Sequence, residues 1–298
     1  MPRRRLNPIT IFGGDYDRGG WVIPSTGSHF YVDNTYGDDS AKGDHWDTAF
    51  KTLQVAIDAC TTRVGDVITV MNRTETVTET VNFNKTGITV QVARLGGSRN
   101  AMGEYCCLLA DTTFTDGPVA TITAPCTIDG LGFASRDTGA TFWSGAAALI
   151  GGLATASPYG VHMKNCRFPK WGLDNRIGLA IEGSSDCLIE NCLFEGVGAD
   201  FDSGIYVQGA TQNVNIVGNW FRDCTYGVLF GAFAGSGPHC FIHGNHFEDS
   251  KCFSAASAAT GILSDNWCEG ATDTGSYNDT VDNLNALGLV FVDQHYAE

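Results

Sequence analysis

The segment VNIVGNWF, residues 214–221, is one copy of a short pattern that recurs six times between Cys126 and Cys268. Each copy has an aliphatic anchor and a Gly, Asn or Asp two residues later, and in five copies a Phe follows five residues after the anchor. The anchors are spaced 35, 26, 27, 26 and 21 residues apart, and they are Ile128, Met163, Ile189, Ile216, Ile242 and Leu263. Self-similarity at this period indicates a solenoid, in which each unit buries its apolar face against its neighbours.

The pattern also predicts which kind of solenoid forms. Side chains alternate between two faces along a strand, so two residues share a face when an even number of positions separates them. The Phe lies five positions after the anchor, yet both are apolar and expected to face inward. The alternation must therefore shift by one residue between them. This shift falls at the Gly, Asn or Asp, the residues that adopt left-handed backbone angles at the lowest energetic cost. A left-handed residue between two strands indicates a corner in the chain. A second strand-like segment follows in three copies, at residues 178–181, 204–207 and 227–230. We therefore predict an all-β fold, a right-handed, single-stranded parallel β-helix.

The inward columns of the repeat combine amides and thiols. Three consecutive copies place Asn219, Asn245 and Asn266 directly after the corner. Rungs about 4.8 Å apart would let these amides hydrogen-bond up the stack. The chain has 11 cysteines, and most of those on the repeat take inward positions beside Val and Ile, as small apolar side chains do. Because neither CxxC pairs nor a disulfide-framework spacing occurs, we expect reduced thiols in a protein folded in cytoplasm.

The segment before the repeat predicts a cap on the solenoid. Residues 29–33 read HFYVD, residues 37–40 read GDDS, and residues 50–59 read FKTLQVAIDA. Thr52 is the expected N-cap of a short helix that places Leu53, Ala56, Ile57 and Cys60 on one face. This segment resembles the N-terminal cap of pectate-lyase-like β-helix proteins, and the resemblance covers roughly residues 30–270. It implies the fold predicted above with a short N-terminal capping helix, in a superfamily of polysaccharide lyases, glycosidases, phage tailspikes and virion proteins.

Four segments are predicted along the chain. They are an extended N-terminal arm at 1–28, the cap and first strand at 29–71, the β-helix rungs at 72–270, and a C-terminal closing segment at 271–298. The arm has no hydrophobic periodicity and carries three consecutive arginines, Arg3, Arg4 and Arg5. These arginines suit attachment to an acidic groove on a partner.

The charge balance excludes some classes of partner. The chain has 18 Lys plus Arg against 33 Asp plus Glu, a formal net charge of −15. Such acidity argues against nucleic acid and anionic membranes as partners. No segment predicts a membrane span, and the arm lacks the apolar stretch of a secretory signal.

The chain lacks the local signatures of enzymes in the superfamily that it resembles. Polygalacturonase-like enzymes carry Asn-Thr-Asp, Asp-Asp, Gly-His-Gly and Arg-Ile-Lys motifs in that order, and none is present after the cap. Asp200 and Asp202 are the remaining acid/base candidates, whereas Glu195, Arg222 and Glu248 are expected to form an outward ion-pair ladder. We therefore expect no catalytic residues, no bound metal and no cofactor.

Two columns of the repeat are expected to face outward, although they are apolar in the later copies. One column holds Leu193, Trp220 and Trp267, and the other holds Phe241 and Ile262. A contiguous exposed apolar patch marks an interface or a ligand platform. We favour an interface within a closed homo-oligomer, with a glycan platform as the alternative.

These observations favour a non-enzymatic structural protein of a phage virion, a homotrimeric β-helix that decorates the capsid exterior. Its partners would be copies of itself and a capsid shell protein bound through residues 1–28, and assembly would take place in the host cytoplasm. Two alternatives stay open. One is a tailspike-like or bacterial polysaccharide-degrading enzyme, either a lyase or a glycoside hydrolase. The other is a module that binds a host surface glycan through Trp220 and Trp267.

Overall fold

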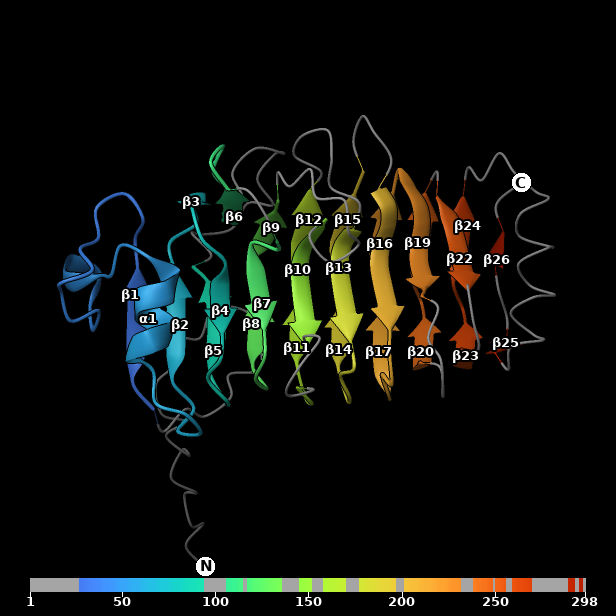
Figure 1. The fold of residues 1–298 in the computed structure, drawn as a ribbon, viewed down its shortest axis with the longest axis horizontal. Helices are drawn as coiled ribbons and strands as arrows, with labels where there is room; N and C mark the ends of the chain where they lie inside the picture. Colours follow the sequence, from blue (N-terminus) through green and yellow to red (C-terminus); the bar gives the residue numbers. More distant parts are fainter. Residues whose placement is uncertain are drawn as a thin grey trace, which may run out of the picture.

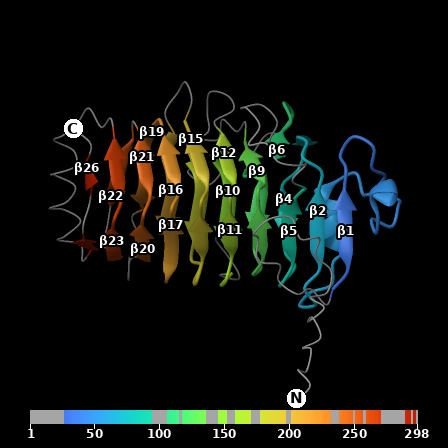
Figure 2. The same ribbon diagram turned by 180° about the vertical axis from the view of Figure 1, so that it is seen from behind.

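A computed structural model describes this chain at residues 27–93, 106–114, 117–135, 145–151, 158–169, 177–196, 201–231, 238–248, 250–255, 259–269, 289–292 and 295–296. At residues 201, 202, 251, 254, 255, 289–292 and 295–296 the backbone alone is described. The described residues form three long parallel sheets and one α-helix, α1 (Leu53–Ala59), preceded by the short 3-10 helix η1 (Trp46–Thr48). The strands stack side by side into an elongated body with α1 at its N-terminal end (Figures 1 and 2).

The three sheets, named A, B and C, contain ten, nine and seven of the described strands. Sheet A contains β1 (His29–Val32), β2 (Val67–Val70), β5 (Thr89–Val92), β8 (Thr127–Asp129), β11 (His162–Lys164), β14 (Leu188–Glu190), β17 (Val214–Val217), β20 (His239–His243), β23 (Thr260–Ser264) and β25 (Leu289–Val292). Sheet B contains β3 (Glu75–Val77), β6 (Cys107–Ala110), β9 (Gly132–Ala134), β12 (Arg167–Pro169), β15 (Leu193–Glu195), β18 (Trp220–Arg222), β21 (His246–Glu248), β24 (Trp267–Glu269) and β26 (His295–Tyr296). Sheet C contains β4 (Val81–Phe83), β7 (Ala120–Ile122), β10 (Ala146–Gly151), β13 (Ile177–Glu182), β16 (Phe201–Gln208), β19 (Cys224–Phe230) and β22 (Lys251–Ala255). Neighbouring strands pair in parallel, so the predicted parallel β-helix is confirmed.

Phenylalanine rings stack directly on one another inside the solenoid. Phe168, Phe194, Phe221 and Phe247 are partners in register on successive strands of sheet B. Their ring centroids lie 4.6, 4.9 and 4.8 Å apart, and all four side chains are fully buried. A side chain at Gly204 in sheet C would overlap the ring of Phe221. This explains why the repeated segment 204–207 begins with glycine. The predicted inward Phe column is therefore confirmed.

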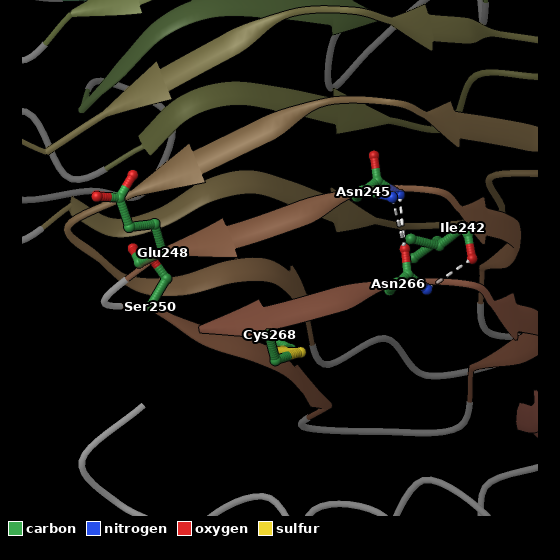
Figure 3. The surroundings of a disulfide bond; sticks show 7 residues. Ile242, Asn245, Glu248, Ser250, Asn266 and Cys268 are labelled. Atoms are coloured by element: carbon green, nitrogen blue, oxygen red, sulfur yellow. Dashed lines mark hydrogen bonds between the residues drawn. A yellow bond between two sulfur atoms is a disulfide. The ribbon is translucent and has the colours of Figure 1, made fainter. Parts of the chain in front are cut away.

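The corner between sheets A and B has the left-handed backbone that the sequence predicts. The corner residues of the six copies all have positive φ angles, from 51° to 83°, and they are Gly130, Asn165, Asn191, Gly218, Gly244 and Asp265. Directly after the corner, Asn219, Asn245 and Asn266 are buried and form the expected ladder. Figure 3 shows its last two members, Asn245 and Asn266. Each Nδ2 donates to a backbone carbonyl of the preceding rung, at 2.9, 2.9 and 3.0 Å. Each Oδ1 accepts a backbone N–H from that rung, at 2.8, 2.9 and 3.1 Å.

Nine of the 11 cysteines are free and buried, in agreement with their expected role as small apolar side chains. Burial raises the pKa of the Cys126 thiol to about 12, which keeps it protonated at neutral pH. The expectation of reduced thiols is wrong at one place, because Cys252 and Cys268 form a disulfide with their Cα atoms 6.8 Å apart (Figure 3). Cys268 occupies the position that Phe fills in the other rungs and pairs in register with Phe247, so its smaller side chain leaves room for the second sulfur.

Helix α1 covers the N-terminal end of the stack, as the sequence predicts. Leu53, Ala56 and Ile57 are buried, and the helix packs against β1, β2 and β4. Thr52 is the N-cap residue, as predicted, but its side chain makes no capping hydrogen bond. Instead, Asp39 accepts the N–H groups of Lys51 and Thr52 at 2.8 Å each, and Glu75 accepts that of Leu53 at 3.2 Å. Carboxylates from neighbouring segments therefore satisfy the donors that open the helix.

Replacing Asn245 by alanine should reveal how much the ladder stabilises the fold. The change leaves the carbonyl of Ile216 and the N–H of Asn219 without their partners in a buried corner. We expect the free energy of unfolding in urea to fall by about 2–4 kcal/mol. Asn215→Ala, on the outer face of the adjacent strand, is the matched control and should cost less than about 0.5 kcal/mol. Equal losses for the two variants would contradict a stabilising ladder.

The buried carboxyl group of Glu75 predicts a pH dependence of stability. Burial raises its pKa from 4.5 to about 7; the Leu53 N–H opposes this shift, and Asp39 adds to it. Since the folded chain holds this proton more tightly than the unfolded chain, ionisation destabilises the fold as pH rises from about 4.5 to about 7. Glu75→Gln should remove a decline on the order of 2–3 kcal/mol over that range. The exposed control Glu79→Gln should keep the decline, and an unchanged decline in Glu75→Gln would refute the assignment.

Candidate functional site

The outer face of sheet B carries an exposed aromatic column, which we name the sheet B stripe. It consists of Leu193, Trp220, His246 and Trp267, which are partners in register on β15, β18, β21 and β24. Trp220 is 47% exposed and Trp267 is 42% exposed, whereas Leu193 is half-buried. The ring of His246 lies between the two indoles, with its centroid 5.5 Å from that of Trp220. The outward direction predicted for Leu193, Trp220 and Trp267 agrees with the structure.

Charged side chains flank the sheet B stripe and hold it in place. Trp220 Nε1 donates to Glu248 Oε2 at 3.1 Å, and Arg222 Nε lies 3.6 Å from Glu248 Oε1. His246 Nε2 lies 3.3 Å from Glu269 Oε2. Glu195 pairs with Arg167 on the preceding strand, at 2.7 Å from its Nε. The expected ion-pair ladder thus exists between Arg222 and Glu248, but Arg167 is the partner of Glu195.

The second outward column, the sheet A stripe, consists of Phe241 and Ile262 on β20 and β23. Ile262 is 43% exposed, and Phe241 is half-buried with its ring edge against His239, at 4.9 Å between centroids. The expectation of one contiguous patch is wrong, because the exposed corner residues Gly218 and Gly244 separate the two stripes. The residue before each anchor and the residue four after it both face outward. Because the corner lies between them, they point to different sides of the solenoid. The structure therefore presents two apolar stripes on adjacent faces.

The outer face of sheet C holds a set of residues that the sequence analysis missed. A buried apolar column of Ala180 and Tyr206, with half-buried Leu149 and Leu229 on either side, runs across β10, β13, β16 and β19. Glu182 and Gln208 form the next outward column, in register with each other at the ends of β13 and β16. The available signal was that both residues directly follow the similar segments 178–181 and 204–207.

Glu182 is the ionisable group that this face isolates. Its Oε2 is buried and has no hydrogen-bond partner. Burial raises the pKa of Glu182, and both burial and the nearby Glu182 raise the pKa of Tyr206. An unpaired carboxylate oxygen is costly in a protein, so this position is suited to accept a hydrogen bond from a bound molecule.

Several predicted site residues lie outside the described part of the chain. Arg3, Arg4, Arg5 and Asp200 are not among the described residues, and Asp202 is described only as backbone within β16. The described residues hold no cluster of three or more His, Cys, Asp or Glu side chains placed to bind a metal ion. Within the same ranges, no helix combines the length and apolarity needed to cross a membrane.

Comparison with known proteins identifies the architecture. A family model described as right handed beta helix region matches residues 149–291. Pectate lyase Pel9A superposes with a TM-score of 0.51 at 16% identity, over 83% of this chain and 70% of its own. This chain has the fold of a right-handed parallel β-helix.

Two further structures resemble this β-helix. Escherichia coli YbhC gives a TM-score of 0.57 at 12% identity, over 98% of this chain and 90% of its own. Pectin methylesterase PemA from Erwinia chrysanthemi gives 0.45 at 11% identity, over 80% and 78%. No curated protein sequence matches this chain.

The expectation of a non-enzymatic protein is overturned by these comparisons. The solved structures that share the fold include enzymes, among them pectate lyase Pel9A. At 16% identity two proteins of one fold need not share local sequence signatures, so missing motifs do not exclude an enzyme. The inference from absent signatures was wrong because it took motifs of particular families as markers of the whole fold.

Proposed function

We propose that this β-helix is a structural protein of a virion and assembles as a homotrimer through its two apolar stripes. The observation that carries the proposal is the position of the stripes on either side of one corner. A closed ring of identical subunits needs two different contact faces on each copy, one for each neighbour. The sheet B stripe of one copy and the sheet A stripe of the next would supply those two faces.

The energetics of the exposed tryptophans support association. Trp220 and Trp267 leave about half of each indole in water on a rigid sheet. At about 25 cal/mol/Å², covering the exposed half of a side chain of roughly 250 Å² contributes on the order of 3 kcal/mol. The pairing of Arg222 with Glu248 neutralises charge beside Trp220, which lowers the cost of bringing two acidic chains together.

Attachment to the particle is the second part of the proposal. Residues 1–28, with Arg3, Arg4 and Arg5, would bind a capsid shell protein through an acidic groove. The acidic β-helix would then project from the capsid exterior after assembly in the host cytoplasm. This part rests on the contrast between the three arginines of the arm and the acidity of the chain as a whole, whose net charge is −15.

Native mass spectrometry tests the assembly directly. We expect a particle of three chains of 31.8 kDa each at micromolar concentration. The double variant Trp220→Ser/Trp267→Ser should shift the population to monomers, and Phe241→Ser/Ile262→Ser should do the same because the ring needs both faces. Tyr159→Ser is the control, since this exposed tyrosine lies outside both stripes. Monomers of the unaltered chain, or trimers that survive both double variants, would rule out the proposed ring.

A second candidate function is action on a polysaccharide, by a lyase or glycoside hydrolase, or by a module that binds glycan without cleavage. Trp220 and Trp267 lie two rungs apart, about 10 Å along the stack, with His246 between them. Exposed indoles in a row offer flat faces for sugar rings, and Glu248 and Glu269 beside them can accept hydroxyl hydrogen bonds. The fold shared with pectate lyase Pel9A is consistent with this candidate.

Affinity electrophoresis in gels that contain polysaccharides distinguishes this candidate from assembly. Glycan binding at the stripe predicts retardation that Trp220→Ala and Trp267→Ala each weaken about tenfold, because each removes one stacking face. Release of reducing ends, lost in Asp202→Asn or Glu248→Gln, would identify an enzyme, and retardation alone would identify a binding module. Retardation that persists in both tryptophan variants would remove the stripe from glycan recognition.

A further inference from the structure

A groove with a volume of about 220 Å³ crosses the N-terminal ends of β2, β5, β8 and β11, which are neighbours in sheet A (Figure 1). Its lining includes Ile88 and Cys126, which are 1% and 4% exposed, and the half-buried side chains of Val67 and Pro125. None of the described residues that line it is charged. The groove is therefore a neutral and mainly apolar surface on a chain with a net charge of −15.

Glycines at the corner between sheets C and A keep this groove open. Gly65, Gly87 and Gly160 lie in register at that corner, with φ angles of 78°, 80° and 79°, and all three line the groove. On two later rungs the same position holds Asp186 and Asn213, with φ angles of 55° and 53°. The left-handed backbone of this corner therefore accepts a short polar side chain. On the earlier rungs glycine leaves that space empty.

The described chain begins at one end of this groove. Gly27 lies directly against the first of the corner glycines, because a Cβ at Gly27 would fall 2.5 Å from the backbone nitrogen of Asp66 and 2.7 Å from the carbonyl carbon of Gly65. The N–H of Ser28 donates to Asp66 Oδ1 at 2.6 Å, and the carbonyl of Ser28 accepts the N–H of Val67 at 2.9 Å. Since Gly65 and Val67 line the groove, these contacts fix the point at which residues 1–26 join the body.

The residues that precede Gly27 match the groove in polarity. Residues 21–24 read WVIP, which is the longest apolar run of the arm, and residues 19–26 contain no charged side chain. The volume of the groove is below the roughly 300–1,000 Å³ that is typical of small-molecule sites, and it suits a few apolar side chains. A charged partner would lose hydration there without gaining an ion pair. The groove therefore favours an apolar peptide segment as its occupant.

The length of the segment also fits. The groove runs from Gly65 to Gly160 over four neighbouring strands, which is about 14 Å at the usual strand spacing. Residues 21–26 span at most about 20 Å when they are extended. The apolar run can therefore reach every rung of the groove from its fixed attachment at Gly27.

We propose that residues 21–24 dock into the groove at the corner between sheets C and A of the same chain. Docking removes the indole of Trp21 from water, and it fixes the place from which Arg3, Arg4 and Arg5 leave the body. The inference goes beyond the proposed function and is independent of it. Neither a trimer nor attachment to a shell protein is needed for the segment to dock.

Limited proteolysis of the full chain with chymotrypsin tests the docking, because this protease cuts after aromatic residues. The arm offers one site inside the docked run, after Trp21, and another outside it, after Tyr16. A synthetic peptide of residues 1–28 gives the rate of cleavage of the undocked arm at each site. We expect cleavage after Trp21 to be about tenfold or more slower in the chain than in the peptide, because the protease cuts only the open form. Cleavage after Tyr16 should agree within about twofold.

Two matched glycine variants locate the protection. Gly160→Asn adds a side chain whose Cβ lies 4.0 Å from that of Pro125, inside the groove, and Asn213 shows that asparagine fits this corner. This variant should raise the rate of cleavage after Trp21 by at least about threefold. Gly244→Asn makes the same change at the corner between sheets A and B, where a Cβ meets nothing within 4 Å, and should leave the rate unchanged.

A variant of the arm keeps the test decisive if Gly160→Asn does not fold. Ile23→Ser, compared with a peptide that carries the same change, should also lose most of the protection after Trp21, and urea unfolding verifies that the body is intact. Three results would each overturn the proposal. They are equal rates after Trp21 in chain and peptide, protection that persists in both Gly160→Asn and Ile23→Ser, and protection that disappears on dilution from micromolar to nanomolar concentration. The last result would assign the groove to the arm of a second copy.

Discussion

The register of each rung on the one before is the constraint on which the whole structure depends. Parallel pairing satisfies the backbone groups of the strands, but the left-handed corner interrupts it and leaves buried donors and acceptors. Asn219, Asn245 and Asn266 fill that gap with a donor and an acceptor each. A slip of one residue would turn both the amides and the Phe rings toward solvent and bring outward residues such as Trp220 into the core. The amide and ring columns therefore enforce the same register by different means.

A solenoid also has ends, and the N-terminal end shows what closing one requires. The apolar face of α1 covers the stack, but its seven residues leave most of the first N–H groups without partners inside the helix. Asp39 and Glu75 supply acceptors, which places the Glu75 carboxyl group in a buried position with a raised pKa. The cap therefore provides acceptors for these N–H groups, but it places an ionisable group in the interior.

The sequence predicted sheets A and B in detail because their positions keep fixed offsets from the anchor. Phe194 and Phe221 are each five residues after their anchors, and the short corner leaves no freedom between them. Sheet C has no such offset, because the connection from sheet B varies in length from one rung to the next. Ile205 follows Ile189 by 16 residues, whereas Val228 follows Ile216 by 12. Glu182 therefore could not be assigned a face from the pattern alone. The two stripes were predicted to face outward, but their separation depends on the direction of the corner.

The stacked Phe rings and Asn amides restrict only the residues that face inward. The outer faces of the three sheets can therefore serve different purposes in one fold. In the proposed ring, sheets A and B contact the two neighbours, and the outer face of sheet C lies outside both contacts. This division follows from the corner, because a single patch would favour a two-fold dimer, whereas two stripes on adjacent faces favour a closed ring. It also fits the charges, since paired Arg222 and Glu248 lie beside the sheet B stripe, while the unpaired Glu182 lies on sheet C. Assembly, as proposed, would therefore leave the outer face of sheet C unchanged.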